Sequence, residues 1–136
     1  MITLSYGVGG LLLIAAALGF GFGAFSAWTQ TVAWMAIFFF ASAGASSAYL
    51  TASELFPLET RALAIAVFYA LGSAIGGVAA PLLFGFHIAK HAPWPLAGGY
   101  LLAALLMLAA ALAEALFGID AEGRSLEDIA NPLSSK

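Results

Sequence analysis

Charged residues are scarce in this sequence, and cysteine is missing altogether. Only 8% of the 136 residues are Asp, Glu, Lys or Arg, whereas 63% are hydrophobic, and the mean hydropathy is +1.03. A water-soluble domain carries about a quarter of its residues charged, so the composition excludes that class and indicates an integral membrane protein. The absence of cysteine excludes disulfides. No basic cluster is present, so nucleic acid is not an expected partner.

Four long hydrophobic runs take the place of the missing charges. A membrane-spanning helix needs about 20 apolar residues to cross a hydrocarbon core of about 30 Å. In lipid every backbone polar group has to be paired within its own segment, so each run is predicted to be a helix. The fold class is therefore all-α integral membrane, with four transmembrane helices within residues 1–118 and a polar cytoplasmic tail over residues 119–136. The predicted helices cover residues 2–25, 29–51, 62–88 and 96–117.

The connections between the runs are short, so neighbouring helices are predicted to be antiparallel, with both chain ends on one side. Arg61, Arg124 and Lys136 fall on the side of the chain ends, and Lys90 falls on the other. Because Lys and Arg favour the cytoplasmic side, the predicted location is the plasma (inner) membrane, multi-pass, with both termini cytoplasmic.

The second and third runs carry polar and small residues, whereas the first and fourth are rich in Leu and Ala, as is typical of lipid-facing helices. In the second run Ser42, Ser46 and Tyr49 follow one another at steps of four and three, which places them on one helix face. Two interpretations of this face stay open: hydrogen bonding between helices, or the lining of a water-filled cavity.

Glycines and a proline mark the third run. Gly72 and Gly76 form a G-x-x-x-G spacing, which lets helices approach closely, so packing is the simplest interpretation. Pro81 has no amide hydrogen and therefore leaves the carbonyl of Gly77 without its helical partner. The segment between Gly77 and Pro81 is predicted to be a kink or hinge.

No arrangement of residues supports catalysis or metal binding. His87 and His91 flank Lys90 in the third connection, where a polar loop is a simpler interpretation than a metal site. An ionisable residue inside a membrane span is a functional candidate by default. Here that residue is Glu114, but it lies about one turn from the end of its run, from where its side chain can reach the interface. We expect no enzyme, no cofactor and no metal.

The charged connection "SELFPLETR", residues 53–61, resembles a motif of the major facilitator superfamily, in its sugar-porter-like or metabolite:H+ symporter-like branch. There the tenth helix ends in a Ser-Glu-x-x-Pro element followed by an arginine, matched here by Ser53, Glu54, Pro57 and Arg61.

The regions after this connection are also similar to that family. The small residues of the third run, with Pro81 and Gly85 near its end, resemble the family's eleventh helix. The sequence "AEGRSLEDIA", residues 121–130, resembles the ending that follows the family's twelfth helix, although the glutamate stands directly before the glycine here.

This resemblance implies that the chain is the C-terminal portion of a secondary active transporter, similar to helices nine to twelve of a twelve-helix fold. Such a protein moves a small organic solute, such as a sugar or an organic acid, by alternating access and often as a symporter. The expected partners are membrane lipid, the solute, and the missing N-terminal half or another membrane chain. We expect the chain to transport nothing by itself.

The resemblance also implies roles for particular residues. Glu54 and Arg61 would belong to a charge network that closes the cytoplasmic side and rearranges during transport. The second and third helices would line the solute cavity, and the hinge or packing positions would be Gly72, Gly76, Gly77 and Pro81. The candidate cavity-lining residues are Trp34, Phe38, Ser42, Ser46, Tyr49, Tyr69 and Ser73.

Two other classes stay open. A small four-helix membrane exporter, working as an oligomer, has a similar length and helix number, but it depends on a membrane-embedded glutamate in its first helix, and residues 2–25 contain no acidic residue. A non-transporting accessory membrane subunit, using its glycine-rich faces to bind partners, is the second alternative.

Overall fold

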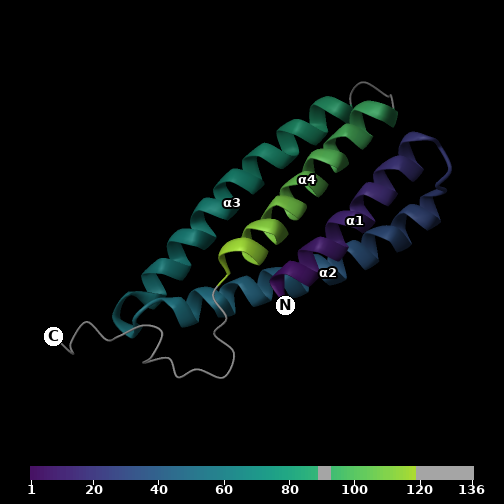
Figure 1. The fold of residues 1–136 in the computed structure, drawn as a ribbon. Helices are drawn as coiled ribbons and strands as arrows, with labels where there is room; N and C mark the ends of the chain where they lie inside the picture. Colours follow the sequence, from purple (N-terminus) through teal and green to yellow (C-terminus); the bar gives the residue numbers. More distant parts are fainter. Residues whose placement is uncertain (89–92, 119–136) are drawn as a thin grey trace.

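The computed structural model describes residues 1–88 and 93–118, and in these ranges the chain forms helices and no strands (Figure 1). All four helices are long and apolar enough to cross a membrane, which agrees with the prediction of an all-α fold over the described residues and of four candidate membrane spans. The predicted polar tail, residues 119–136, lies outside the described residues. The helices are α1 (Ile2–Gly21), α2 (Ala27–Leu55), α3 (Leu58–Ile88) and α4 (Pro93–Phe117).

The connection between α1 and α2 shows why α1 ends earlier than the hydrophobic run predicts. Gly23 adopts a left-handed backbone conformation, with φ of +69°, and the amide of Ala24 donates to the carbonyl of Gly19 at 2.9 Å. This closes the helix in the manner of a glycine C-cap. Ser26 then caps α2, because its hydroxyl accepts the amide of Thr29 at 3.2 Å.

The connection between α2 and α3 is shorter than predicted. Phe56 lies before a proline and is extended, with φ of −106° and ψ of 139°, which ends α2. The carbonyl of Pro57 accepts the amides of Thr60 and Arg61 at 3.0 and 2.9 Å, which begins α3. The charges of this region therefore lie in the terminal turns of two helices rather than in a loop.

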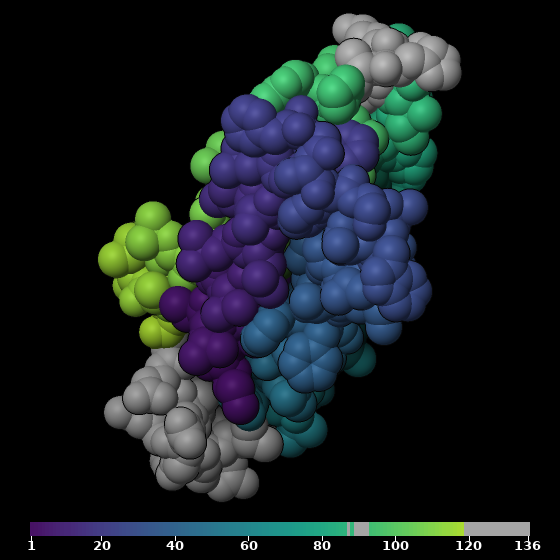
Figure 2. All heavy atoms as spheres, turned by 90° about the vertical axis from the view of Figure 1, so that its right-hand side faces the viewer, coloured from purple at the N-terminus to yellow at the C-terminus, as the bar shows by residue number. Residues whose placement is uncertain are grey.

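Helix α1 is the centre of the packing, and it lies between α2 and α4 on the face shown in Figure 2. Leu13, Ala16 and Ala17 of α1 are buried together with residues of both neighbours, including Ile37 of α2 and Tyr100 of α4. The expectation that the first helix mainly faces lipid is wrong for this chain, since α1 has the largest buried share of the four spans. Its small residues allow close approach to the neighbouring helices.

Helix α3 stands apart from this packed group, and its aromatic contacts with the other helices lie toward its two ends. Near its beginning the rings of Tyr69 and Tyr49 are 6.3 Å apart, and near its end the rings of Phe84 and Tyr100 are 5.7 Å apart. No residue in the most apolar part of α3 is buried. A long face of α3 therefore has no partner among the described residues.

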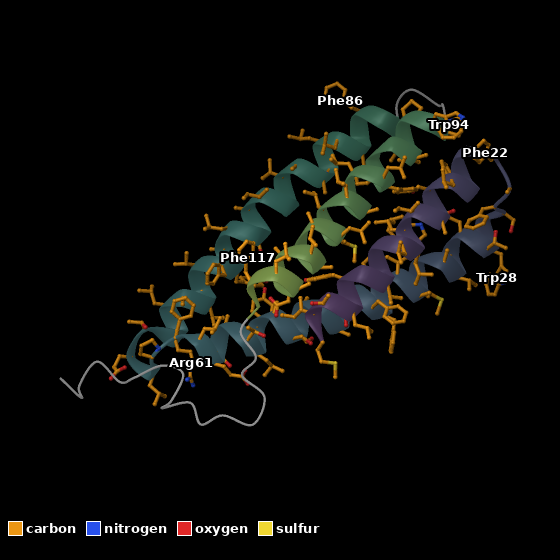
Figure 3. All side chains as sticks on the ribbon, viewed as in Figure 1. Phe22, Trp28, Arg61, Phe86, Trp94 and Phe117 are labelled. Atoms are coloured by element: carbon orange, nitrogen blue, oxygen red, sulfur yellow. The ribbon has the colours of Figure 1, made fainter. Side chains whose placement is uncertain are left out.

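The two ends of the bundle differ in chemistry. Trp28 and Trp94, labelled in Figure 3 beside Phe22 and Phe86, gather at the end where α1 meets α2, as is typical of a membrane–water interface. At the opposite end lie Arg61 and the other charged side chains of residues 1–88 and 93–118, so the described charges are all at one end of the membrane-spanning bundle.

Candidate functional site

A cavity of about 710 Å³ lies at the charged end of the bundle. The first residues of α1, the last three turns of α2 and the last turns of α4 form its walls, and Phe68 contributes from α3. Phe117, at the end of α4, is labelled in Figure 3. Because Ile2 and Gly118 both line it, the beginning of α1 and the end of α4 lie at the same end of the molecule.

Small residues create this space. Where α2 and α4 face the cavity, the lining is largely alanine, at Ala45, Ala48 and Ala52 on α2 and at Ala110 and Ala113 on α4. Helices that carry only methyl groups on facing surfaces, and are held apart by larger residues elsewhere, leave a volume between them. The cavity is therefore mainly apolar.

Aromatic rings close the cavity around these alanines. Tyr6 of α1 lies against α2, where a Cβ atom added at Gly44 would be 2.9 Å from the Tyr6 ring. Phe56 and Phe68 lie together at the other side, with ring centroids 6.1 Å apart. Tyr49 lines the cavity and also contacts α3 through its ring.

Few polar groups face this volume. The hydroxyl of Thr51 donates to the carbonyl of Ser47 at 3.1 Å, and its oxygen can still accept a hydrogen bond. Tyr6 and Tyr49 contribute phenolic hydroxyls. Within residues 1–88 and 93–118, Glu114 is the one charged residue of the lining, and its side chain makes no ion pair or hydrogen bond there. The described lining is thus mainly apolar, with one carboxylate and three hydroxyls.

Of the predicted cavity-lining residues, Tyr49 lines this cavity and the other six lie outside it. Trp34 stacks on Phe38 at 5.7 Å and meets Tyr100 of α4 edge-on at 5.4 Å, so it joins α2 to α4. The remaining predicted residues are exposed on α2 and α3 and do not line this cavity: Phe38, Ser42, Ser46, Tyr69 and Ser73.

Glu54 and Arg61 lie at the facing ends of α2 and α3, but the described residues contain no ion pair between them. A terminal nitrogen of Arg61, Nη2, instead donates to the carbonyl of Phe56 at 3.5 Å, and the buried Nε has no hydrogen-bond partner in the described part of the chain. The direct contact expected within a closing charge network is therefore not formed, and the gating role stays a prediction.

The predicted hinge and packing positions contact no neighbouring helix. A Cβ atom added at Gly72, Gly76 or Gly77 would meet nothing within 4 Å. Pro81 lies inside α3, which continues through it to Ile88 as one helix. The close helix approaches of this chain are made by other glycines, Gly9 and Gly10 above all, so packing at Gly72 and Gly76 would need a partner beyond the described residues.

The sequence did not indicate Tyr6 as a cavity residue, and Glu114 was expected to reach the interface rather than to line a cavity. The signal for Glu114 was present, since it is the one acidic residue inside a hydrophobic run. For Tyr6 no signal was available, because its role depends on which helix α1 packs against. Among the described residues no group of three or more metal-ligating side chains converges. The side chain of His87, together with Lys90 and His91, lies outside what the structure describes.

Compared with known proteins, the chain matches no family model, no curated protein sequence and no solved structure.

Proposed function

We propose that this chain is the C-terminal part of a secondary active transmembrane transporter for a small organic solute, of the major facilitator kind. In this proposal α2 and α3 line the solute path and the rest of the path is supplied by another membrane domain. Transport proceeds by alternating access.

The main support for this proposal is that several serine hydroxyls on α2 and α3 have no hydrogen-bond partner within the described residues. Ser47 and Thr51 return their hydroxyls to carbonyls of their own helix, at 2.9 and 3.1 Å. Ser42, Ser46 and Ser73 are exposed and make no hydrogen bond within the described part of the chain. Moving a hydroxyl from water into hydrocarbon without a hydrogen-bond partner costs about 4–8 kcal/mol. These three side chains therefore suit water, a polar solute or another protein better than lipid.

The uncovered face of α3 supports the same proposal. Glycines on this helix leave its backbone open along Gly72 to Gly77, and nothing in the described residues covers them. Lipid is as apolar as a protein interior, so hydrophobicity alone does not hold a membrane helix against its neighbours. A helix that packs only near its ends therefore gains little stability from the rest of its own chain. A second transporter domain would supply the missing contacts.

The absence of cysteine makes this proposal directly testable. We expect Ser42→Cys, Ser46→Cys and Ser73→Cys to react with a membrane-impermeant maleimide when the chain is in its native membrane. Matched controls are Leu11→Cys and Leu105→Cys, which are exposed on α1 and α4 in apolar surroundings and should stay unlabelled. Equal protection of the serine positions and the controls would mean that no water-filled path runs along α2 and α3.

A second measurement addresses the chain by itself. Proteoliposomes that contain only this chain should show no saturable uptake of sugars or organic acids, because four helices cannot surround a path that opens alternately to two sides. Saturable uptake by the chain alone would overturn the view that a second domain is needed.

The alternatives are a small four-helix exporter and an accessory membrane subunit that acts as an oligomer. The uncovered face of α3 favours the accessory subunit over the exporter, because it offers a binding surface and needs no carboxylate in α1. Protection of all three serine positions from the maleimide, together with cross-linking of α3 to another protein, is the result that this alternative predicts.

A further inference from the structure

We infer that the cavity at the charged end of the bundle binds a small organic cation with an apolar body, held by the carboxylate of Glu114. This inference goes beyond the transport proposal and does not depend on it, since a chain that transports nothing can still bind such a ligand.

The charge of the cavity lining supports this inference. Among the described residues that line the cavity, Glu114 alone is charged, and no described cation pairs with it. The described guanidinium, that of Arg61, is directed to the carbonyl of Phe56 instead. A positive group beside a carboxylate is attracted to it, and more strongly next to apolar walls than in open water. The cavity is therefore complementary to a cation.

The walls provide the second argument. Tyr6, Tyr49, Phe56, Phe68 and Phe117 all contribute to the lining. The negative face of an aromatic ring attracts a cation and also packs against apolar groups. The volume of about 710 Å³ lies within the range of about 300–1,000 Å³ that is typical of small-molecule sites.

The scarcity of polar groups narrows the ligand class. A sugar carries a hydroxyl on most of its carbons and needs a partner for each, but the described lining offers three hydroxyls, from Tyr6, Tyr49 and Thr51, and one carboxylate. An organic anion would be repelled by Glu114. A protonated amine or quaternary cation with a bulky apolar body matches the carboxylate with its charge and the apolar walls with its body.

The test uses two probe ions of nearly equal size and shape but opposite charge, tetraphenylphosphonium and tetraphenylborate. Equilibrium dialysis of the purified full chain in an uncharged maltoside detergent measures their binding. We expect saturable binding of one tetraphenylphosphonium per chain, and at least about tenfold weaker binding of tetraphenylborate, where tenfold corresponds to about 1.4 kcal/mol.

Three variants connect this binding to the cavity. Glu114→Gln should weaken tetraphenylphosphonium binding about tenfold or more and remove the discrimination between the two ions. Glu59→Gln, at an exposed carboxylate outside the lining, is the matched control and should change neither. Ala113→Phe keeps Glu114 but fills the cavity from α4, and it should abolish binding of both ions. Because it leaves the carboxylate in place, it also tests the site if Glu114→Gln does not fold.

The inference is overturned if both ions bind equally, if tetraphenylphosphonium partitions without saturation, or if Ala113→Phe leaves binding unchanged. A lipid with a choline headgroup presents the same ammonium chemistry, so choline lipid is added in a separate series. Displacement of the probe at one lipid per chain would assign the cavity to a lipid headgroup and overturn the inference of a free solute. Failure of transport in proteoliposomes leaves these binding results unaffected.

Discussion

The glycines of α1 differ in whether a neighbouring helix lies close to them. A Cβ atom added at Gly10 would lie 2.9 Å from the side chain of Leu108 and 3.3 Å from the carbonyl oxygen of Ala104. At Gly7, one turn earlier in the same helix, it would meet nothing within 4 Å. The same residue type therefore serves close packing at one position and has no such role at the other.

We expect Gly10→Ala to destabilise the chain by roughly 1–3 kcal/mol, the usual cost of overpacking a tight contact. The matched variant Gly7→Ala should be neutral or stabilising by up to about 1 kcal/mol, because alanine favours helix more than glycine does. Thermal unfolding of both variants in detergent, followed by circular dichroism, measures the difference. Equal unfolding temperatures would contradict the close α1–α4 contact.

Gln30, in the first turns of α2, presents the opposite situation. Its side-chain nitrogen and oxygen are both buried, and neither has a hydrogen-bond partner within the described residues. Leaving a buried polar group without a partner costs about 1–3 kcal/mol. We expect Gln30→Leu to raise the unfolding temperature, with a gain of about 1 kcal/mol.

Thr31→Val is the control for this change. The Thr31 hydroxyl donates to the carbonyl of Ala27 on an exposed surface, and its loss should change stability by less than about 0.5 kcal/mol. A lower unfolding temperature for Gln30→Leu would show that the amide has a partner, such as bound water.

Among the helices, α3 is the least supported by its own chain. Its contact with α4 depends on Phe84, whose ring lies against Gly99, where an added Cβ atom would be 2.9 Å away, and 5.7 Å from the ring of Tyr100. Aromatic pairs of this kind contribute about 0.5–1.5 kcal/mol beyond their buried area. No other ring contact between the second half of α3 and α4 is found among residues 1–88 and 93–118.

We therefore expect Phe84→Ala to release the second half of α3, with a clear loss of amide hydrogen-exchange protection after Gly76. Phe86→Ala is the matched control, since Phe86 is on the same helix and 72% exposed (Figure 3). It should leave the protection of α3 unchanged. Equal protection in both variants would show that α3 is held by contacts other than this ring.

At the scale of the whole molecule, the first residues of α1 and the last residues of α4 lie together at the cavity, at the end that holds the charged side chains of residues 1–88 and 93–118. Alternation of four antiparallel helices requires both of these points to be on the same side of a membrane. The tryptophans of the opposite end, Trp28 and Trp94, suit the other interface.

Reporter fusions test this arrangement. A fluorescent protein joined before Met1 and, in a second fusion, after Gly118 should fluoresce in both cases, because both fusion points are predicted to be cytoplasmic. Alkaline phosphatase at the same two points should be inactive. Opposite results at the two points would contradict an even number of spans between them, whereas phosphatase activity at both would reverse only the predicted orientation.

Much of the fold was predictable from local features of the sequence. The hydrophobic runs indicated four helices and a connection between residues 51 and 62, and in the structure Pro57 ends α2 within that range because a proline restricts the residue before it. The left-handed Gly23 was missed, since nothing in the hydrophobic run distinguishes a glycine that ends a helix from one inside it. The residues of the cavity were mostly missed as well, with Tyr49 as the exception among the predicted set.

The sequence by itself indicated a membrane environment and the four long helices of the described residues, because apolar composition and segment length are properties of each segment alone. Only the tertiary structure decided that α1 is central, that Gly10 rather than Gly76 makes a close contact, and that Glu114 faces a cavity with Tyr6. The physical reason is the bilayer. Lipid is as apolar as a protein interior, so hydrophobicity does not distinguish a buried face from an exposed one, and shape complementarity between helices makes that choice.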